Sequence, residues 1–146
     1  MLELSKEDKL KYRLYNLCNY IRCLNIIHFL LFIYNFGLSL QKNDFENIFF
    51  NCLHLFLITP IMYFSVKNYI MYFIIISEVY KICFIIYKLF YFYSFYTFIE
   101  IFIINIDIYI IYFNLKFIHF NYNASKEIII SLSDGWKPIN KILYLY

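Results

Sequence analysis

The sequence predicts an all-α protein, a polytopic membrane bundle of about four transmembrane helices joined by short loops. Of its 146 residues, 63% are hydrophobic and only 16% are charged, which leaves too little polar surface for a soluble domain of this length. The apolar residues form long runs with short polar breaks, and a helix needs a run of about 20 such residues to cross a bilayer. With only two glycines and two prolines, the chain lacks the frequent turns of a membrane β-barrel.

The runs divide the chain in order. Residues 1–20 form a polar, amphipathic tail. Residues 69–113 contain no turn signal, and as one helix at about 1.5 Å per residue they would be roughly twice as long as the ~30 Å hydrocarbon core is thick. They must therefore fold back, with the Lys- and Tyr-rich patch 88–96 at the membrane interface. The predicted transmembrane helices are 23–40, 45–66, 69–87 and 95–115, and 116–146 holds a short motif and the start of a last helix.

The distribution of charge predicts which side each end occupies. Four crossings place the tail, the break at 67–68 and the segment after residue 115 on one side. That side holds Lys6, Lys9, Lys11, Arg13, Arg22, Lys67, Lys116, Lys126, Lys137 and Lys141, whereas the other side holds Lys42 and Lys88. Because basic residues collect on the cytoplasmic face, the tail and the C-terminal segment are predicted to be cytosolic.

Composition excludes several classes of function. Cys18, Cys23, Cys52 and Cys83 form no CxxC pair, so neither a disulfide framework nor a metal site is expected. The net charge is only +3, and no basic stripe beyond the tail suggests a nucleic-acid partner. No Ser-His-Asp, paired-carboxylate or Cys-His arrangement is recognisable. The chain is therefore predicted to be a non-enzymatic protein of the lipid bilayer without a cofactor.

Four ionisable residues fall inside the predicted spans: Glu78, Lys81, Glu100 and Asp107. Charged groups in a membrane are costly unless they are paired or face protein or water. Two interpretations stay open, namely a proton or ion path and a polar seam that binds neighbouring helices or a partner.

The spacing of these residues predicts their contacts. Glu78 and Lys81 lie three residues apart and can pair within one helix, while Glu100, Asp107 and Asn114 recur every seven residues and form one polar stripe. A hairpin turning near residues 90–92 would bring Lys81 level with Glu100. His28 and His54, each alone on an apolar face, are expected to be packed or interfacial.

Several short stretches occur in a distinctive order. DFENIFFNC at 44–52 keeps Asp, Asn and Cys at fixed spacing and is followed by Ile-Thr-Pro at 58–60; FIINID lies at 102–107, EIIISL at 127–132 and KILY at 141–144. This series resembles the cornichon family, whose members have an acidic Asn-containing segment, an apolar Asn-x-Pro element, a cytosolic Glu-Ile-Phe-Arg-Thr-Leu motif and a last membrane helix.

The resemblance implies a cargo receptor that packages membrane proteins into COPII vesicles, resident in the endoplasmic reticulum and early Golgi. It implies that Glu127, Ile128, Ile129, Ile130, Ser131 and Leu132 bind the COPII coat, and that Glu78, Lys81, Glu100 and Asp107 are candidate contacts to transmembrane cargo. A β-branched run favours an extended shape and can lie along a groove of a partner. The alternative is an apolar patch on the membrane surface.

Two further functions are compatible with the sequence: a structural subunit of an organellar membrane complex, and a small ion or proton transporter built on the four charged residues. The acceptor pattern Asn123-Ala124-Ser125 is predicted to stay unglycosylated, because it faces the cytosol.

Overall fold

The computed structural model describes residues 5–91 and 98–138, and every regular element in these ranges is a helix. The elements are α1 (Lys6–Gln41), α2 (Phe45–Leu53), the π-helical turn η1 (His54–Ile58), α3 (Thr59–Lys67), α4 (Met71–Tyr91), α5 (Phe98–Tyr122) and α6 (Lys126–Ser133). The predicted all-α class is confirmed.

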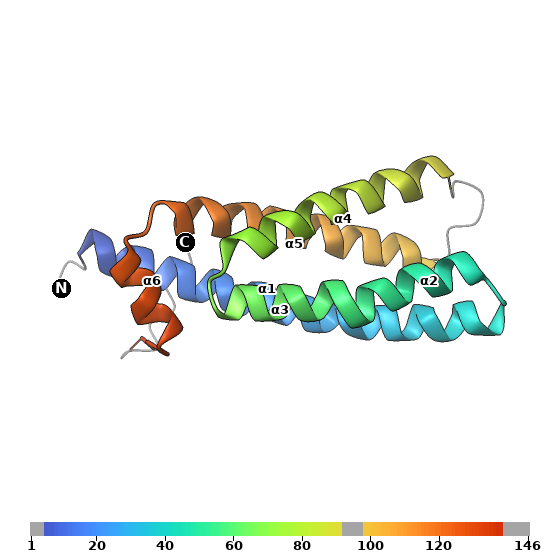
Figure 1. Cartoon of the computed structure of the whole chain (residues 1–146), viewed down its shortest axis with the longest axis horizontal. Helices are drawn as coiled ribbons and strands as arrows, with labels where there is room; N and C mark the ends of the chain where they lie inside the picture. The colour runs from blue at the N-terminus through green and yellow to red at the C-terminus, as the bar shows by residue number, and fades with distance from the viewer. Residues whose placement is uncertain (1–4, 92–97, 139–146) are drawn as a thin grey trace.

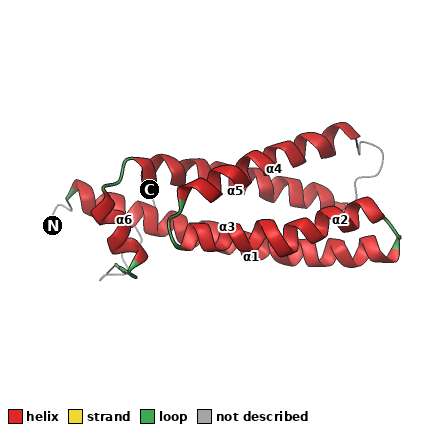
Figure 2. Ribbon diagram, viewed as in Figure 1, coloured by secondary structure: helices red, strands yellow, loops and turns green. Residues whose placement is uncertain are grey.

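The long helices lie side by side as an elongated antiparallel bundle (Figure 1). α2, η1 and α3 form one uninterrupted helical rod, Phe45–Lys67. α1 packs against this rod and against α5, and α4 packs against α3 and α5. Short turns at 42–44 and 68–70 join the first rods (Figure 2). Such short connections make sequence neighbours antiparallel.

Three of the helical rods are long and apolar enough to cross a membrane: Lys6–Gln41, Phe45–Lys67 and Phe98–Tyr122. Helices of this kind indicate a membrane-embedded protein. α4 has 21 residues, which is also a spanning length, but it carries Glu78, Lys81 and Lys88. Large apolar side chains face outward along the bundle, including Phe56, Ile76 and Tyr109, as a lipid-facing exterior requires.

The boundaries of the helices differ from the predicted ones. The polar tail is not a separate segment, because α1 begins at Lys6 and continues through it. Ser5 caps this helix by accepting a hydrogen bond from the Asp8 backbone N–H at 3.1 Å, and no proline interrupts the helix up to Gln41. α4 extends to Tyr91, beyond the predicted end at 87. The predicted start at 95 and most of the patch 88–96 lie in 92–97, outside the described residues.

The buried positions of α1 follow a seven-residue repeat. They are Leu14, Cys18, Ile21, Asn25, His28, Phe32, Asn35 and Ser39, with alternating spacings of four and three. α5 repeats the pattern with Glu100, Ile103, Asp107, Ile110, Asn114 and Phe117. This spacing is the signature of left-handed helix packing in bundles. Polar residues occupy core positions of that repeat.

The π turn η1 keeps the second rod in phase with its neighbours. The backbone N–H of Thr59 donates to the carbonyl of His54, five residues earlier. An α-helix joins residues four apart, so this turn contains one extra residue. The buried side chains of this region are His54 and Leu55 within the turn, followed by Thr59 and Met62 in α3. The extra residue rotates α3 so that its polar and apolar core positions continue the seam of α2.

The end of the bundle beside the α1 N-terminus is closed by an apolar core. This α6-end core comprises Leu14, Cys18, Ile21, Met62, Val66, Tyr69, Ile74, Phe117, Ile128 and Leu132. α6 lies across this end (Figure 1) and contributes Ile128 and Leu132 to it. The Asn121 side chain donates to the Tyr69 carbonyl at 3.1 Å, which fastens the 68–70 turn to α5.

Deleting Leu57 tests the role of the π turn. The deletion would rotate α3 by about 100° relative to α2, so that Met62 and Val66 leave the core. We expect the free energy of unfolding in detergent to fall by about 2–5 kcal/mol, the usual effect of losing a large core side chain. Leu57→Ala retains the residue count and truncates a side chain that is 48% exposed, so it should unfold close to wild type. Equal stability of the deletion and the wild type would contradict this role.

Candidate functional site

Ionisable side chains from every long rod lie inside the bundle. His28, His54, Glu78, Lys81, Lys88, Glu100 and Asp107 are all buried, together with several Asn, Ser and Thr residues. They form two groups along the bundle axis. The turn-side cluster, near the 42–44 turn, consists of Asn35, Ser39, Asn47, Asn51, Lys88 and Glu100. The central cluster consists of His28, Glu78, Lys81, Asp107 and Asn114.

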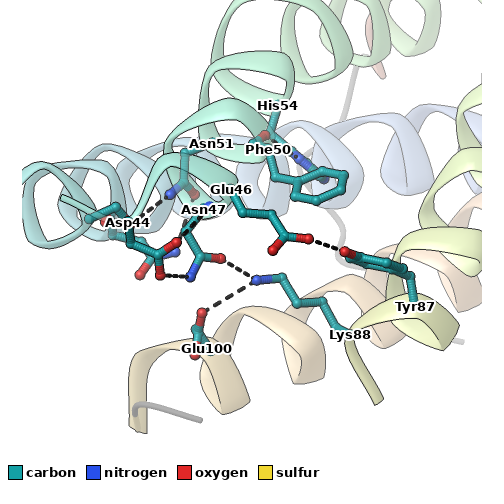
Figure 3. Close-up of polar contacts among 11 residues, drawn as sticks. Asp44, Glu46, Asn47, Phe50, Asn51, His54, Tyr87, Lys88 and Glu100 are labelled. Carbon is teal, nitrogen blue, oxygen red and sulfur yellow. Dashed lines mark hydrogen bonds and ion pairs between the residues drawn. The ribbon is translucent and has the colours of Figure 1, made fainter. Parts of the chain in front are cut away.

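The turn-side cluster begins at the cap of α2 (Figure 3). Asp44 accepts hydrogen bonds from both the backbone and the side-chain nitrogen of Asn47, the latter at 2.6 Å. Lys88 reaches in from α4, donates to the Asn47 side-chain oxygen, and lies 3.4 Å from a carboxylate oxygen of Glu100. The capping residue of α2 is thereby linked to α4 and α5.

Asn51 extends this network to α1. Its side-chain oxygen accepts from Asn35 and its nitrogen donates to the Ser39 hydroxyl, both at 3.2 Å. The cluster borders a small cavity, large enough for about one water molecule, between its polar groups and the rings of Phe32 and Phe84.

An aromatic layer separates the two clusters. The Phe32 ring stacks on His54 at a centroid distance of 4.2 Å, and Phe84 lies 4.5 Å from the same imidazole. His54 Nδ1 is 3.0 Å from the Phe50 carbonyl oxygen and 3.4 Å from the Tyr80 hydroxyl. The His54 imidazole and the Tyr80 hydroxyl are therefore polar groups within a mainly aromatic layer.

The central cluster joins three helices at Asp107. His28 Nε2 of α1 lies 2.8 Å from Asp107 Oδ1, and Lys81 Nζ of α4 lies 3.7 Å from the same oxygen. The Asp107 and Lys81 side chains are 0% and 1% exposed. Desolvation of an ion pair is compensated only by close contact and further hydrogen bonds, so this arrangement demands accurate placement of all three helices.

Glu78 and Asn114 lie beside this contact. The Asn114 amide donates to Glu78 Oε1, and both residues are buried. Glu78 Oε2 and Asn114 Oδ1 have no hydrogen-bond partner within the described ranges, and the same holds for His54 Nε2 and Thr59 Oγ1. Buried polar atoms without partners are rare in folded proteins and call for an explanation.

The predicted membrane charges thus face one another inside the bundle. The predicted polar stripe of Glu100, Asp107 and Asn114 is confirmed, since all three residues are buried on one face of α5. Whether these residues and their partners on α4 recognise cargo stays a prediction.

The predicted register of the α4–α5 hairpin is wrong. Lys81 lies beside Asp107 and Lys88 beside Glu100. Both pairs are centred on sequence position 94, whereas the predicted pairing of Lys81 with Glu100 is centred between positions 90 and 91. The predicted turn at 90–92 falls short because α4 continues to Tyr91. The predicted pairing of Glu78 with Lys81 within α4 is also replaced, because each residue has its close polar contact on α5.

The proposed coat-binding run is a helix, and the expectation of an extended segment is wrong. Ser125 caps α6 by accepting from the Ile128 N–H at 3.3 Å, and Ile128 and Leu132 are each 4% exposed. Ile128 and Leu132 are four residues apart, so a helix places both on the face that packs against the bundle. Glu127 and Ile130 are exposed, and Ile129 and Ser131 are half-buried. The matching KILY stretch, 141–144, lies outside the described residues.

Several members of the site were not predicted from the sequence. His28 and His54 were expected to be packed or interfacial and Lys88 to lie at the membrane interface. Among the buried Asn residues, only Asn114 was predicted to belong to a polar stripe. The signal was the seven-residue spacing of Asn25, His28, Asn35 and Ser39 with the apolar core of α1, which places these residues toward the other helices.

Within the described ranges, no group of three or more His, Cys, Asp or Glu residues is arranged to hold a metal ion. Comparisons with protein-family models, with curated proteins and with solved structures found no match to this chain.

A double-mutant cycle tests the central contact. Asp107→Asn and Lys81→Met each leave an uncompensated buried charge, so each should lower the free energy of unfolding by about 3–5 kcal/mol. The double variant should lose clearly less than the sum, measured by denaturant unfolding in detergent. Lys81→Met combined with Glu100→Gln is the control and should be nearly additive, because Glu100 contacts Lys88 instead. Additivity of the first pair would contradict a direct contact between Lys81 and Asp107.

Proposed function

We propose that the protein is a small membrane transporter that binds and passes protons through its interior. The observation that carries this proposal is the meeting of His28, Lys81 and Asp107 at one buried point. An imidazole in contact with a carboxylate can take up and release a proton near neutral pH. Ionisable residues within membrane helices usually mark proton relays or ion pathways.

Stability alone is a weak reason for such a cluster. A buried ion pair is often no more stabilising than apolar side chains of similar size, and each charge at the centre of a membrane helix raises the insertion free energy by about 2.5–3.5 kcal/mol. Asn residues at a few core positions would suffice to hold the helices together. Seven His, Lys, Asp and Glu side chains are buried within the described ranges, and their presence therefore favours a chemical role.

The order of the groups along the axis suggests a route. From the 42–44 turn it passes Lys88 and Glu100, the small cavity and His54 in the aromatic layer. It then reaches Asp107 and finally Glu78. Beyond that point the α6-end core closes the bundle with apolar side chains. In this proposal the conformation described is closed at the α6 end. Transport then requires the α6-end core to open.

The transporter proposal includes α4 as the fourth crossing. α4 packs between α3 and α5, and its charged residues contact α5 and α2 in the interior of the bundle. We further propose that the α6 end is cytosolic, because the described basic residues of the tail, of α6 and of the 68–70 turn region gather at that end.

Proton flux into proteoliposomes tests the proposal. Wild-type protein should acidify or alkalinise the lumen in response to an imposed potential, read by an entrapped pH dye. Asp107→Asn removes the shared carboxylate and should reduce the flux to the rate of empty liposomes. The neighbouring Ile108→Ala alters an outward-facing side chain and should leave the flux unchanged. Flux that survives in Asp107→Asn, or no wild-type flux above empty liposomes, would contradict the proposal.

A second candidate function is that of a cornichon-like receptor for COPII packaging in the early secretory pathway. The observation that favours it is the exposure of Ile130, which is 58% exposed on α6, at the end with the basic residues. A single outward Ile beside Glu127 can enter a pocket of a coat subunit, although the run does not dock in the extended form.

Coat capture in a budding reaction with ER membranes tests this second candidate. Ile130→Ala should reduce packaging of the protein into vesicles without unfolding it, because the side chain makes few internal contacts. Ile33→Ala, which truncates an exposed side chain on α1, serves as the matched control. Equal packaging of both variants and the wild type would eliminate the receptor candidate.

A further inference from the structure

We infer that Glu78 is a proton-binding group that holds its proton in a reciprocal hydrogen-bonded pair with Asn114. The binding of the proton is argued from the contacts of these two residues. The further statement that this proton is the one transported rests on the proposed function.

The two side chains are already joined on one side. Asn114 Nδ2 of α5 donates to Glu78 Oε1 of α4. Glu78 is 4% exposed and Asn114 is 0% exposed, so neither obtains hydrogen bonds from bulk solvent. On the other side, Glu78 Oε2 and Asn114 Oδ1 are both without a partner within the described ranges.

A single proton satisfies both vacant oxygens. An ionised carboxylate only accepts hydrogen bonds, and so does an amide oxygen, so an ionised Glu78 leaves two buried acceptors unpaired. A protonated Glu78 has one O–H donor, and Asn114 Oδ1 belongs to the amide that it already contacts. If the Asn114 amide is turned over, its oxygen meets Oε1 instead, and a proton on the carboxyl group is again required.

Charge balance leads to the same assignment. The charged groups that act on Glu78 are Lys81 on its own helix and Asp107 on α5. Asp107 in turn contacts His28 of α1, whose ring lies 6.0 Å from that of His54 on the second rod. With neutral imidazoles, Lys81 and Asp107 compensate each other. An ionised Glu78 would leave one net negative charge buried in the bundle, which is strongly unfavourable. Protonation of Glu78 removes that charge.

A proton suits this place better than a metal cation. Hard cations bind through many oxygen ligands at once, whereas a proton needs only a donor oxygen and an acceptor oxygen. When Glu78 releases its proton, the O–H bond breaks, the electron pair stays on the carboxylate, and the proton passes to water admitted by opening of the α6-end core. Uptake from water reverses these changes.

Infrared spectroscopy of the full chain in liposomes at neutral pH tests the inference. We expect the C=O stretch of a protonated carboxyl group, shifted in D₂O. The band should be lost in Glu78→Gln and displaced in Asn114→Leu, which removes the amide partner. Glu100→Gln is the control and should leave the band in place, because Glu100 pairs with Lys88. The wild-type spectrum decides the inference even if a variant fails to fold, since the absence of any D₂O-sensitive protonated-carboxyl band overturns it.

The same preparation separates this inference from the proposed function. A band assigned to Glu78 without proton flux supports the inference and contradicts the transporter. Flux without the band supports the transporter and overturns the assignment of Glu78. A band that persists in Glu78→Gln places the proton on another carboxyl group and also overturns it.

Discussion

Lys81 and Asp107 share a contact at which both side chains are almost fully buried, and the arrangement of the long helices is consistent with the need to keep them together. An unpaired charge inside an apolar bundle is strongly destabilising, so α4 and α5 have little freedom to slide past each other. His28 adds α1 to the same point. The register of three helices is therefore fixed by one set of polar atoms, while the apolar exterior fixes only that the helices lie in the membrane.

The remaining features of the bundle accommodate this constraint. The π turn adds one residue to the second rod and brings His54 and then Thr59 to the interior. Asp44 caps α2 and orients Asn47 toward Lys88, so a second ion pair is stabilised two turns of α4 away from the first. Toward α6 the interior becomes apolar. The interior of the bundle is therefore polar near the 42–44 turn and at its centre, with the aromatic layer between these two clusters. It is closed by apolar side chains at the α6 end.

The sequence pattern was sufficient to predict the class of fold and the polar breaks near 42–44 and 68. Apolar runs and the polar residues that interrupt them are local properties of the sequence. It was also sufficient for the stripe of Glu100, Asp107 and Asn114, which follows from the seven-residue spacing. It failed for the α4–α5 register, since the position of a turn within an uninterrupted apolar run depends on which charges pair across the hairpin. It failed for α6 because β-branched residues favour strands only weakly, and burial of Ile128 and Leu132 on α1 and its neighbours outweighs that preference.

Solid-state NMR in lipid bilayers tests the central claim most directly. With ¹⁵N in the imidazole of His28 and ¹³C in the carboxyl group of Asp107, the 2.8 Å contact between nitrogen and oxygen predicts a measurable through-space dipolar coupling between the labelled atoms. Observation of this coupling would establish that these groups meet inside the membrane-embedded bundle. The absence of coupling, in a sample whose helices are intact, would contradict the buried axis on which the proton-binding account depends.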